Sequence, residues 1–191
     1  MLYRESKEIL RKKFLNLRNE LTTSKRNVAE ENAEKIFLES FPQSCNKIIS
    51  AYYPANNELS TLSLLKKLST QGATTALPVI KAKDSPLDFQ KWQHGEKLHR
   101  SKFFNIQEPD NKSVIPDIII LPLLAFDRNM NRLGYGGGFY DRTLKHLEER
   151  KYDFISIGYA YSFQESDEIP TNEQDMPVDY IITDKEILRK T

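Results

Sequence analysis

The sequence predicts an α/β protein, a three-layer α/β/α sandwich around a mostly parallel central sheet. Three observations predict this class. Segments with helical periodicity alternate with short runs of β-forming residues along the chain. One run, residues 117–124, is almost continuously apolar, which is typical of a parallel strand covered on both faces. No linker, repeat or low-complexity tract interrupts the sequence, so we expect a single domain over residues 1–191.

The N-terminal part predicts two helices, over about residues 3–40, that pack on the α/β core. In the first helix, apolar residues recur at helical spacing and share one face: Leu10, Phe14, Leu17 and Leu21. In the second helix, one side carries Val28, Ala29, Ala33, Ile36 and Phe37. The Thr22-Thr23-Ser24 cluster between the two helices supplies candidate N-caps.

The rest of the chain alternates between strand and helix patterns. The run Ile48–Tyr53 is rich in β-forming residues and ends at Pro54. A helical stretch follows, with Leu62, Leu65 and Leu68 on one face. We expect further strands at residues 74–79, 87–92, 117–124, 154–159 and 178–183, and a further helix at residues 139–150.

The composition excludes several classes of protein. Hydrophobic residues make up 39% and charged residues 29% of the chain, as in soluble globular proteins. A net charge of +1 provides no overall field for a nucleic acid, so we expect none as a partner. Cys45 is the only cysteine, and no zinc-ligand spacing occurs. The N-terminus lacks the apolar core of a signal peptide and no stretch could span a bilayer, so we expect a cytoplasmic protein without a membrane partner.

A cluster of glycines marks the predicted functional site. Four of the seven glycines fall between Gly134 and Gly138, after Arg132 and before a predicted helix. The cluster follows the most apolar strand, and ligands bind beyond the strand ends in open α/β sheets. Backbone N–H groups of a glycine-rich turn and of a helix start bind anions, and a guanidinium can hold phosphate oxygens. The segment from Arg132 to Asp141 is therefore predicted to bind phosphate.

Two familiar phosphate motifs do not fit this segment. A P-loop would require Gly-Lys followed by Ser or Thr, which is absent. A dinucleotide-binding fingerprint would require a small residue where Phe139 or Asp141 stands. A turn whose glycines only allow tight packing remains the structural alternative.

The residues around the glycine cluster form a long motif. It consists of Leu121-Pro-Leu-Leu-Ala-Phe-Asp127 and, after a short polar spacer, Arg132-Leu-Gly-Tyr-Gly-Gly-Gly-Phe-Tyr-Asp-Arg142. This motif closely resembles the signature of the 5-formyltetrahydrofolate cyclo-ligase family. The resemblance extends over essentially the full chain, through Lys7-Glu-Ile-Leu-Arg11, Glu58, Phe104-Asn-Ile-Gln-Glu-Pro109, Gln164 and Pro170-Thr-Asn-Glu-Gln-Asp-Met-Pro-Val-Asp179.

The resemblance implies a ligase of one-carbon metabolism. Such an enzyme converts 5-formyltetrahydrofolate to 5,10-methenyltetrahydrofolate and releases ADP and phosphate from ATP. The family implies Mg²⁺, held by Asp141 and Asp175, with Arg132 and Asp141 as catalytic residues. The implied ATP-binding positions are Lys7, Arg11, Arg132, Leu133, Gly134, Tyr135, Gly136, Gly137, Gly138, Phe139 and Tyr140. The implied substrate-binding positions are Tyr53, Glu58, Phe104, Tyr135, Gly136, Gly137, Gly138 and Phe139.

Without the resemblance, these residues have plainer interpretations. Lys7 and Arg11 lie four residues apart, as on a solvated basic helix face. Asp141 could simply favour the start of a helix, and Asp175 could be an exposed carboxylate. Phe104 could belong to the core.

A few positions depart from the family pattern or stay outside the predicted site. Asn105 stands where the family usually has glycine, and Gly137 stands where some relatives carry lysine. Phe103 is adjacent to Phe104, so only one of the two rings is expected to face the site. Arg128 and Arg142 are interpreted as surface charges beside it.

Two other functions are compatible with a glycine turn of this kind. A sugar-phosphate isomerase-like enzyme would use the turn for a substrate phosphate and would give Lys7 and Arg11 no role. A non-enzymatic folate- or nucleotide-binding module would keep the pocket without needing Arg132, Asp141 and Asp175 together. We expect the protein to act as a monomer on ATP and 5-formyltetrahydrofolate.

Overall fold

The computed structural model describes residues 2–104 and 106–190, and side chains from residue 6 onward. Four α-helices are seen in this part of the chain: α1 Leu2–Asn19, α2 Thr23–Ser40, α3 Leu62–Thr70 and α4 Phe139–Glu149. The central sheet is made of β1 Ile48–Ser50, β2 Thr74–Val79, β3 Asp88–Lys91, β6 Ser113–Val114, β7 Ile118–Pro122, β10 Ile155–Tyr159, β11 Tyr180–Ile182 and β12 Ile187–Arg189. Two small hairpins pair β4 His99–Arg100 with β5 Gln107–Glu108, and β8 Ala125–Phe126 with β9 Arg132–Leu133. A short 3₁₀ turn spans Ser162–Gln164.

The central sheet has the strand order β12-β11-β10-β7-β1-β2-β3-β6. Its five middle strands, from β11 to β2, pair in parallel. The strands beyond them, β12 on one side and β3 and β6 on the other, pair antiparallel. The prediction of a mostly parallel central sheet is therefore confirmed, and the antiparallel edges are an addition to it.

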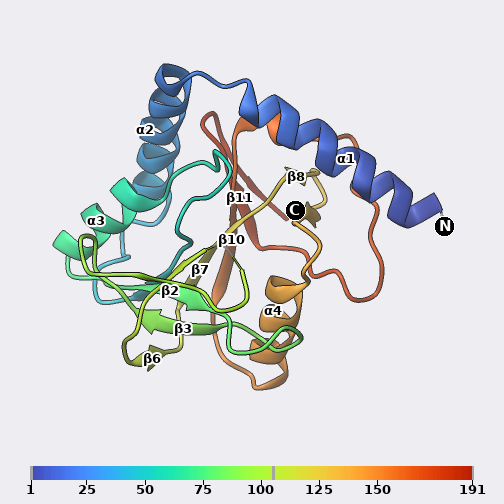
Figure 1. Ribbon diagram of the computed structural model, residues 1–191. Coiled ribbons are helices and arrows are strands. Elements are labelled where there is room, and N and C mark those ends of the chain that lie inside the picture. The colour runs from blue at the N-terminus through green and yellow to red at the C-terminus, as the bar shows by residue number, and fades with distance from the viewer. Residues whose placement is uncertain (1, 105, 191) are drawn as a thin grey trace.

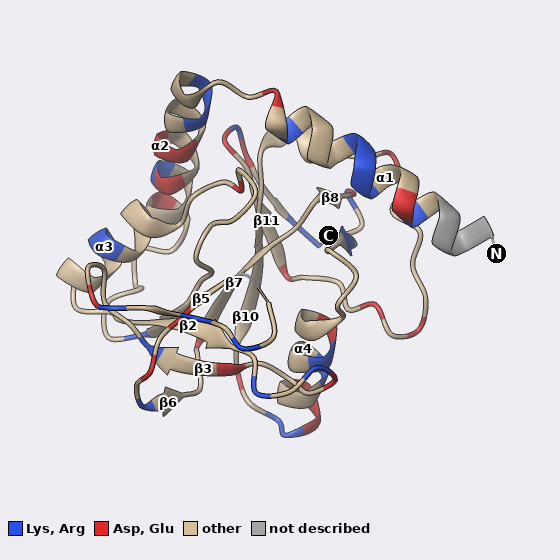
Figure 2. Cartoon of the chain, viewed as in Figure 1, with Lys and Arg blue, Asp and Glu red and all other residues tan. Residues whose placement is uncertain are grey.

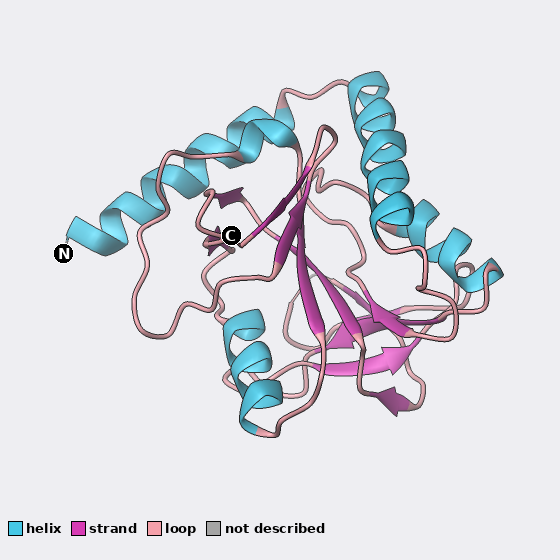
Figure 3. Ribbon diagram, turned by 180° about the vertical axis from the view of Figure 1, so that it is seen from behind, coloured by secondary structure: helices cyan, strands magenta, loops and turns pink. Residues whose placement is uncertain are grey.

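The helices cover both faces of the sheet (Figures 1 and 3). On one face, α2 and α3 pack against Ile118 and Ile120 of β7. On the other face, α4 packs against Ile119 and Leu121 of the same strand. Because successive side chains of a strand point to opposite faces, a strand between two helical layers must be apolar at every position. This explains the unbroken apolar run in the sequence and confirms the three-layer sandwich.

Helix α2 begins as the sequence predicts, but one predicted core residue is exposed. Thr22 is the N-cap, and its hydroxyl accepts a hydrogen bond from the backbone N–H of Lys25 at 3.4 Å. Ala33 and Phe37 are fully buried on the inner face. Val28 was predicted on that face but is 55% exposed, because it lies on the side of the helix turned away from the sheet.

Helix α1 crosses the carboxyl end of the sheet rather than lying along one of its faces (Figure 1). Phe14 is buried with Ala125, Leu133 and Ile169, whereas Leu17 is 37% exposed. The predicted apolar face of α1 is therefore wrong at Leu17. The buried position one residue later is Arg18, which is fully inaccessible to solvent.

Charged residues of both signs are spread over the helices and the connecting loops, while the strands β7 and β10 carry none (Figure 2). No helix in the described part of the chain is long and apolar enough to cross a membrane.

Candidate active site

A cleft of about 1020 Å³ lies where the parallel strands end. Its walls include residues at or just after the carboxyl ends of three strands: Tyr52 and Tyr53 after β1, Pro78 and Ile80 at β2, and Pro122 at β7. Helix α1, the glycine segment and the loop around Asp175 complete the walls. This is the position at which open α/β sheets bind ligands.

Every position that the sequence analysis assigned to a ligand lines this one cleft. These positions come from five separate parts of the chain: Lys7, Arg11, Tyr53, Glu58, Phe104, Arg132, Leu133, Gly134, Tyr135, Gly136, Gly137, Gly138, Phe139, Tyr140, Asp141 and Asp175. The structure thus brings them together at one site.

The glycine segment joins β9 to α4 in a backbone path that needs glycine. Gly136 and Gly138 have positive φ angles of 98° and 64°, a region that residues with a Cβ rarely adopt. Gly138 is the N-cap of α4, so the unpaired N–H groups of the first helical turn begin at the cleft. The segment thus exposes backbone donors at the positive end of a helix dipole.

Arg11 of helix α1 packs directly on this segment. Its Nε donates a hydrogen bond to the carbonyl oxygen of Gly134 at 2.9 Å. A Cβ placed on Gly136 would lie 3.5 Å from the Arg11 guanidinium. This is an ordinary contact distance, so the positive φ of Gly136, rather than a lack of space, favours glycine there. The guanidinium adds positive charge beside the backbone donors.

Arg132 and Asp141 form a nearly buried ion pair at the centre of the cleft wall. Nη2 of Arg132 lies 2.9 Å from Oδ1 of Asp141, and the arginine side chain is 4% exposed. The Nε of Arg132 is buried and has no hydrogen-bond partner among the described residues. The same Asp141 oxygen accepts the backbone N–H of Met176 at 3.1 Å, so the loop that follows Asp175 is held against the start of α4.

Lys7 ties helix α1 to the same loop. Its Nζ lies 2.7 Å and 2.9 Å from the two carboxylate oxygens of Asp175. Asp175 also accepts the backbone N–H of Asn172 at 2.7 Å. The plain interpretations of Lys7 as a solvated base and of Asp175 as an exposed carboxylate are therefore wrong, since both side chains are mostly buried.

Glu58 also lines the cleft, where it is buried and held by two donors. The hydroxyl of Tyr135 donates to one carboxylate oxygen at 2.6 Å, and the backbone N–H of Ala55 donates to the other at 2.8 Å. The pKa of the Glu58 carboxyl is raised above its ordinary value, because the effect of burial exceeds the lowering by these two hydrogen bonds and by the charge of Arg18.

Aromatic rings also line the cleft. Phe104 is 44% exposed and meets the ring of Phe139 edge-on, with ring centroids 5.5 Å apart. Tyr53 meets Trp92 edge-on at 6.4 Å. Phe104 lines the cleft and Phe103 is not among the residues that do, so Phe104 is not a core residue. The neighbouring departure, Asn105, lies outside the described residues.

Near the site, Arg142 differs from its interpretation as a surface charge, and Arg18 was not predicted at all. Arg142, predicted as a surface charge, lines the cleft, donates to the carbonyl oxygen of Gly137 at 2.8 Å and lies over the ring of Phe139. Arg142 thus lies at the cleft itself, because it is the fourth residue of α4 and a side chain in the first helical turn points back toward the preceding loop. Arg18 was missed, and its only sequence signal is the spacing of seven from Arg11 on one face of α1. Arg128 is exposed and pairs with Glu165 and Glu186, as a surface charge does.

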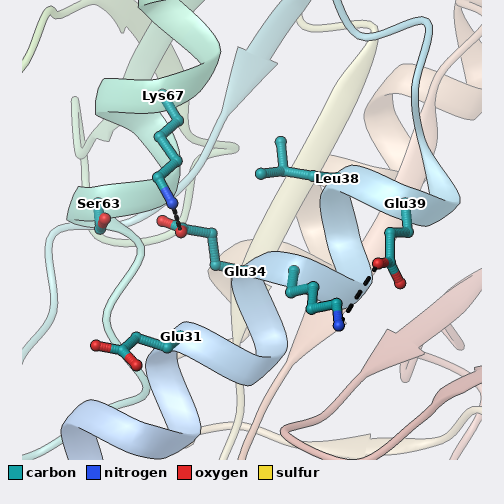
Figure 4. A pocket seen from close by; sticks show the side chains of 7 residues that line it. Glu31, Glu34, Leu38, Glu39, Ser63 and Lys67 are labelled. Atoms are coloured by element: carbon teal, nitrogen blue, oxygen red, sulfur yellow. Dashed lines mark hydrogen bonds and ion pairs between the residues drawn. The ribbon is translucent and has the colours of Figure 1, made fainter.

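A second hollow of about 620 Å³ lies between α2 and α3 (Figure 4). Its charged side chains largely neutralise one another: Lys67 pairs with Glu34, and Lys35 pairs with Glu39. It contains none of the ligand positions predicted from the sequence. We therefore place the candidate active site in the larger cleft.

The fold and the cleft define a class: an α/β protein with a cleft, lined by cationic side chains and a glycine-rich segment, at the carboxyl edge of its parallel sheet. Comparison with known proteins makes this specific. The sequence model of the 5-formyltetrahydrofolate cyclo-ligase family matches residues 3–184. The chain therefore belongs to the 5-formyltetrahydrofolate cyclo-ligase family, a family of ligases.

Individual relatives agree with this assignment. The chain is 32% identical to the 5-formyltetrahydrofolate cyclo-ligase of Haemophilus influenzae, over 91% of this chain and 95% of that protein. The solved structure of 5,10-methenyltetrahydrofolate synthetase from Aquifex aeolicus superposes with a TM-score of 0.80 at 30% identity, covering 96% of this chain and 92% of that one. The corresponding synthetase from Mycoplasma pneumoniae gives a TM-score of 0.75 at 26% identity, covering 94% and 99%.

Proposed function

We propose that this protein converts 5-formyltetrahydrofolate to 5,10-methenyltetrahydrofolate, consuming ATP and releasing ADP and phosphate. We further propose that it acts in the cytoplasm as a monomer. The observation that carries the proposal is that one cleft has two unlike halves. One half offers cations and backbone donors, and the other offers a buried carboxylate and aromatic rings.

The reaction requires activation of a poor leaving group. The formyl oxygen attacks the γ-phosphorus of ATP, the bond from that phosphorus to ADP breaks, and an iminium phosphate forms at N5. N10 then attacks the formyl carbon and loses its proton, after which the carbon–oxygen bond breaks and phosphate leaves. Such a sequence needs positioning and charge neutralisation more than a protein nucleophile.

The cationic half of the cleft suits the phosphates of ATP. Lys7 and Arg11 approach from α1, Arg132 from β9, and the backbone donors from the glycine segment and the start of α4. The Nε of Arg132 is buried and has no partner in the described part of the chain, so a small turn of the side chain toward the cleft would give it a phosphate oxygen as acceptor. These groups would stabilise the charge that develops on the transferred phosphoryl group.

Asp141 and Asp175 fit a magnesium site that is completed by the ligand. No group of three or more acidic, histidine or cysteine side chains that could hold a metal occurs among the described residues. Mg²⁺, however, is usually bound by one or two carboxylates together with substrate phosphates and water. Asp141 and Asp175 would supply these carboxylates. The bound ion would neutralise phosphate charge, while Arg132 and Lys7 keep the two carboxylates in place.

The other half of the cleft suits a reduced folate. The Glu58 carboxylate can accept hydrogen bonds from the amino and ring N–H groups of a pterin. Phe104 and Tyr53 offer partly exposed rings for the aromatic portions of the substrate. Phosphate and folate would then meet at the glycine segment, which borders both halves.

The proposal is tested by mixing the protein with 5-formyltetrahydrofolate, ATP and Mg²⁺ and following the near-ultraviolet absorbance of the conjugated methenyl product. We expect the absorbance to rise only when all three are present. Adding a chelator should stop the rise, and excess Mg²⁺ should restore it. Absence of a rise above a protein-free control would refute the activity.

A further inference from the structure

Arg18 is a charged side chain in an unusual environment. It lies on the face of α1 that also carries Arg11 and Phe14, and it is fully buried. Among the side chains of residues 6–104 and 106–190, no carboxylate forms an ion pair with its guanidinium, and its Nε has no hydrogen-bond partner there. A buried guanidinium without a directly paired anion is costly, so its retention here calls for a function.

The contacts of Arg18 lead to the folate half of the cleft. Its Nη2 donates a hydrogen bond to the hydroxyl oxygen of Tyr135, and its guanidinium lies 5.6 Å from the centre of the Tyr135 ring. The same hydroxyl donates to Glu58 at 2.6 Å. Because a guanidinium can only donate, the tyrosine oxygen must accept from Arg18, and its single proton is directed to Glu58.

This direction constrains the charge of Glu58. One carboxylate oxygen accepts a hydrogen bond from the hydroxyl of Tyr135, and the other accepts one from the backbone N–H of Ala55. Both carboxylate oxygens thus accept a hydrogen bond, an arrangement that favours the ionised carboxylate. The remaining lone pairs lie at the cleft, where they can accept only from N–H or O–H groups of a ligand.

Of the titratable groups that act on Glu58, Arg18 supplies the positive charge. Tyr52, Tyr135 and Tyr140 interact electrostatically with Glu58, and burial raises the pKa of each phenol above its ordinary value. They therefore stay neutral near pH 7. Arg18 is the cation among the described residues whose charge lowers the pKa of Glu58 against the effect of burial.

We propose that Arg18 is a positioning residue for the folate: through the hydroxyl of Tyr135 it keeps the Glu58 carboxylate ionised and oriented toward the N–H donors of the substrate. This inference rests on the proposed function. It assigns to α1 a second task, at the folate, in addition to the phosphate contacts proposed for Lys7 and Arg11.

The test measures turnover of the parent protein, Arg18→Gln, Arg18→Lys and Tyr135→Phe as a function of pH, with each substrate varied in turn. For Arg18→Gln we expect the KM for 5-formyltetrahydrofolate to rise about tenfold or more, as for loss of a charge-assisted interaction. The KM for ATP should change by less than about twofold. The acid limb of kcat/KM for the folate should move to higher pH, because Glu58 without the cation is protonated more readily. Arg18→Lys should recover most of the loss.

The control Lys12→Gln and the variant Tyr135→Phe make the result decisive. Lys12→Gln removes the same charge from the exposed face of α1 and should leave both KM values unchanged. Tyr135→Phe keeps Arg18 and the ring but breaks the link, so it should move the folate KM and the acid limb in the same direction. If Arg18→Gln does not fold, Tyr135→Phe still tests the proposal.

Equal changes in both KM values, or an unshifted acid limb in Arg18→Gln and Tyr135→Phe, would overturn the role of Arg18 while leaving the proposed function intact. A parent protein without turnover would overturn the proposed function and, with it, this inference.

Discussion

At the scale of single residues, the site depends on cations that the fold has removed from solvent. Arg132 is almost fully buried and has one carboxylate partner, Asp141. Its Nε has no hydrogen-bond partner within the residues that the structure describes. A buried, partly unsatisfied guanidinium costs folding free energy, and a phosphorylated ligand would complete its hydrogen bonds.

Replacing Arg132 tests this directly. We expect Arg132→Ala to lower kcat by about 10² to 10³, as when a donor to a developing charge is lost. Arg128 is the matched control, since it lies in the same β8–β9 hairpin but is exposed and pairs with the surface carboxylates of Glu165 and Glu186. Arg128→Ala should keep the parent kcat. Steady-state kinetics, with circular dichroism to verify folding, measure both. Full activity in folded Arg132→Ala would remove Arg132 from the catalytic centre.

Single residues also show where the sequence was informative. Arg132, Asp141 and the glycines stand close together in a motif, so their proximity could be predicted. The exposure of Leu17 and the burial of Arg18 could not be predicted, because helical periodicity defines a helix face but does not fix its angular position to within one residue. Arg18 replaces Leu17 in the interior because Tyr135 and Glu58, both distant in sequence, provide polar partners for it.

At the scale of elements, the glycine segment is the part whose backbone is most closely specified. Gly138 combines a positive φ of 64° with the N-cap position of α4. Gly134 has no positive φ, and a Cβ there would be 3.9 Å from Arg132, an ordinary contact. The two glycines therefore differ in what they require of the backbone, although the sequence alone makes them look equivalent.

This difference predicts the stability of two variants. Gly138→Ala should lower the free energy of unfolding by about 1–2 kcal/mol, because a Cβ strains a left-handed residue. It would also lie 2.7 Å from Nη1 of Arg142, which would have to move. Gly134→Ala should be neutral or stabilise by up to about 1 kcal/mol. Urea denaturation measures both values. Equal effects of the two substitutions would contradict the backbone conformation described for Gly138.

The strands and helices were predicted well in position and less well in extent. β2 spans the expected residues, and β7 is apolar at every position as expected for a buried parallel strand. The strand at Ile48 ends before Tyr52 and Tyr53, whose β-forming side chains belong to the cleft. The pairing of β3 and β12 in antiparallel orientation was not predicted, because it depends on short return connections rather than on strand composition.

At the scale of the whole molecule, the cleft depends on segments that are far apart in sequence. Helix α1 is joined to the loop around Asp175 by Lys7 and to the glycine segment by Arg11. The two proposed ligand halves therefore share one boundary, formed by α1 and the glycine segment. The resemblance to a known family supplied the connection between these segments, which spacing and composition alone left open.

The central claim is that phosphoryl transfer from ATP is coupled to closure of the folate ring in this cleft. The most direct measurement is the amount of ADP formed, determined alongside the amount of 5,10-methenyltetrahydrofolate in the same reaction. We expect equal amounts of the two products throughout the reaction, and no ADP above background when 5-formyltetrahydrofolate is omitted. Methenyl product formed without ADP, or ADP formed at the same rate without the folate, would contradict the account.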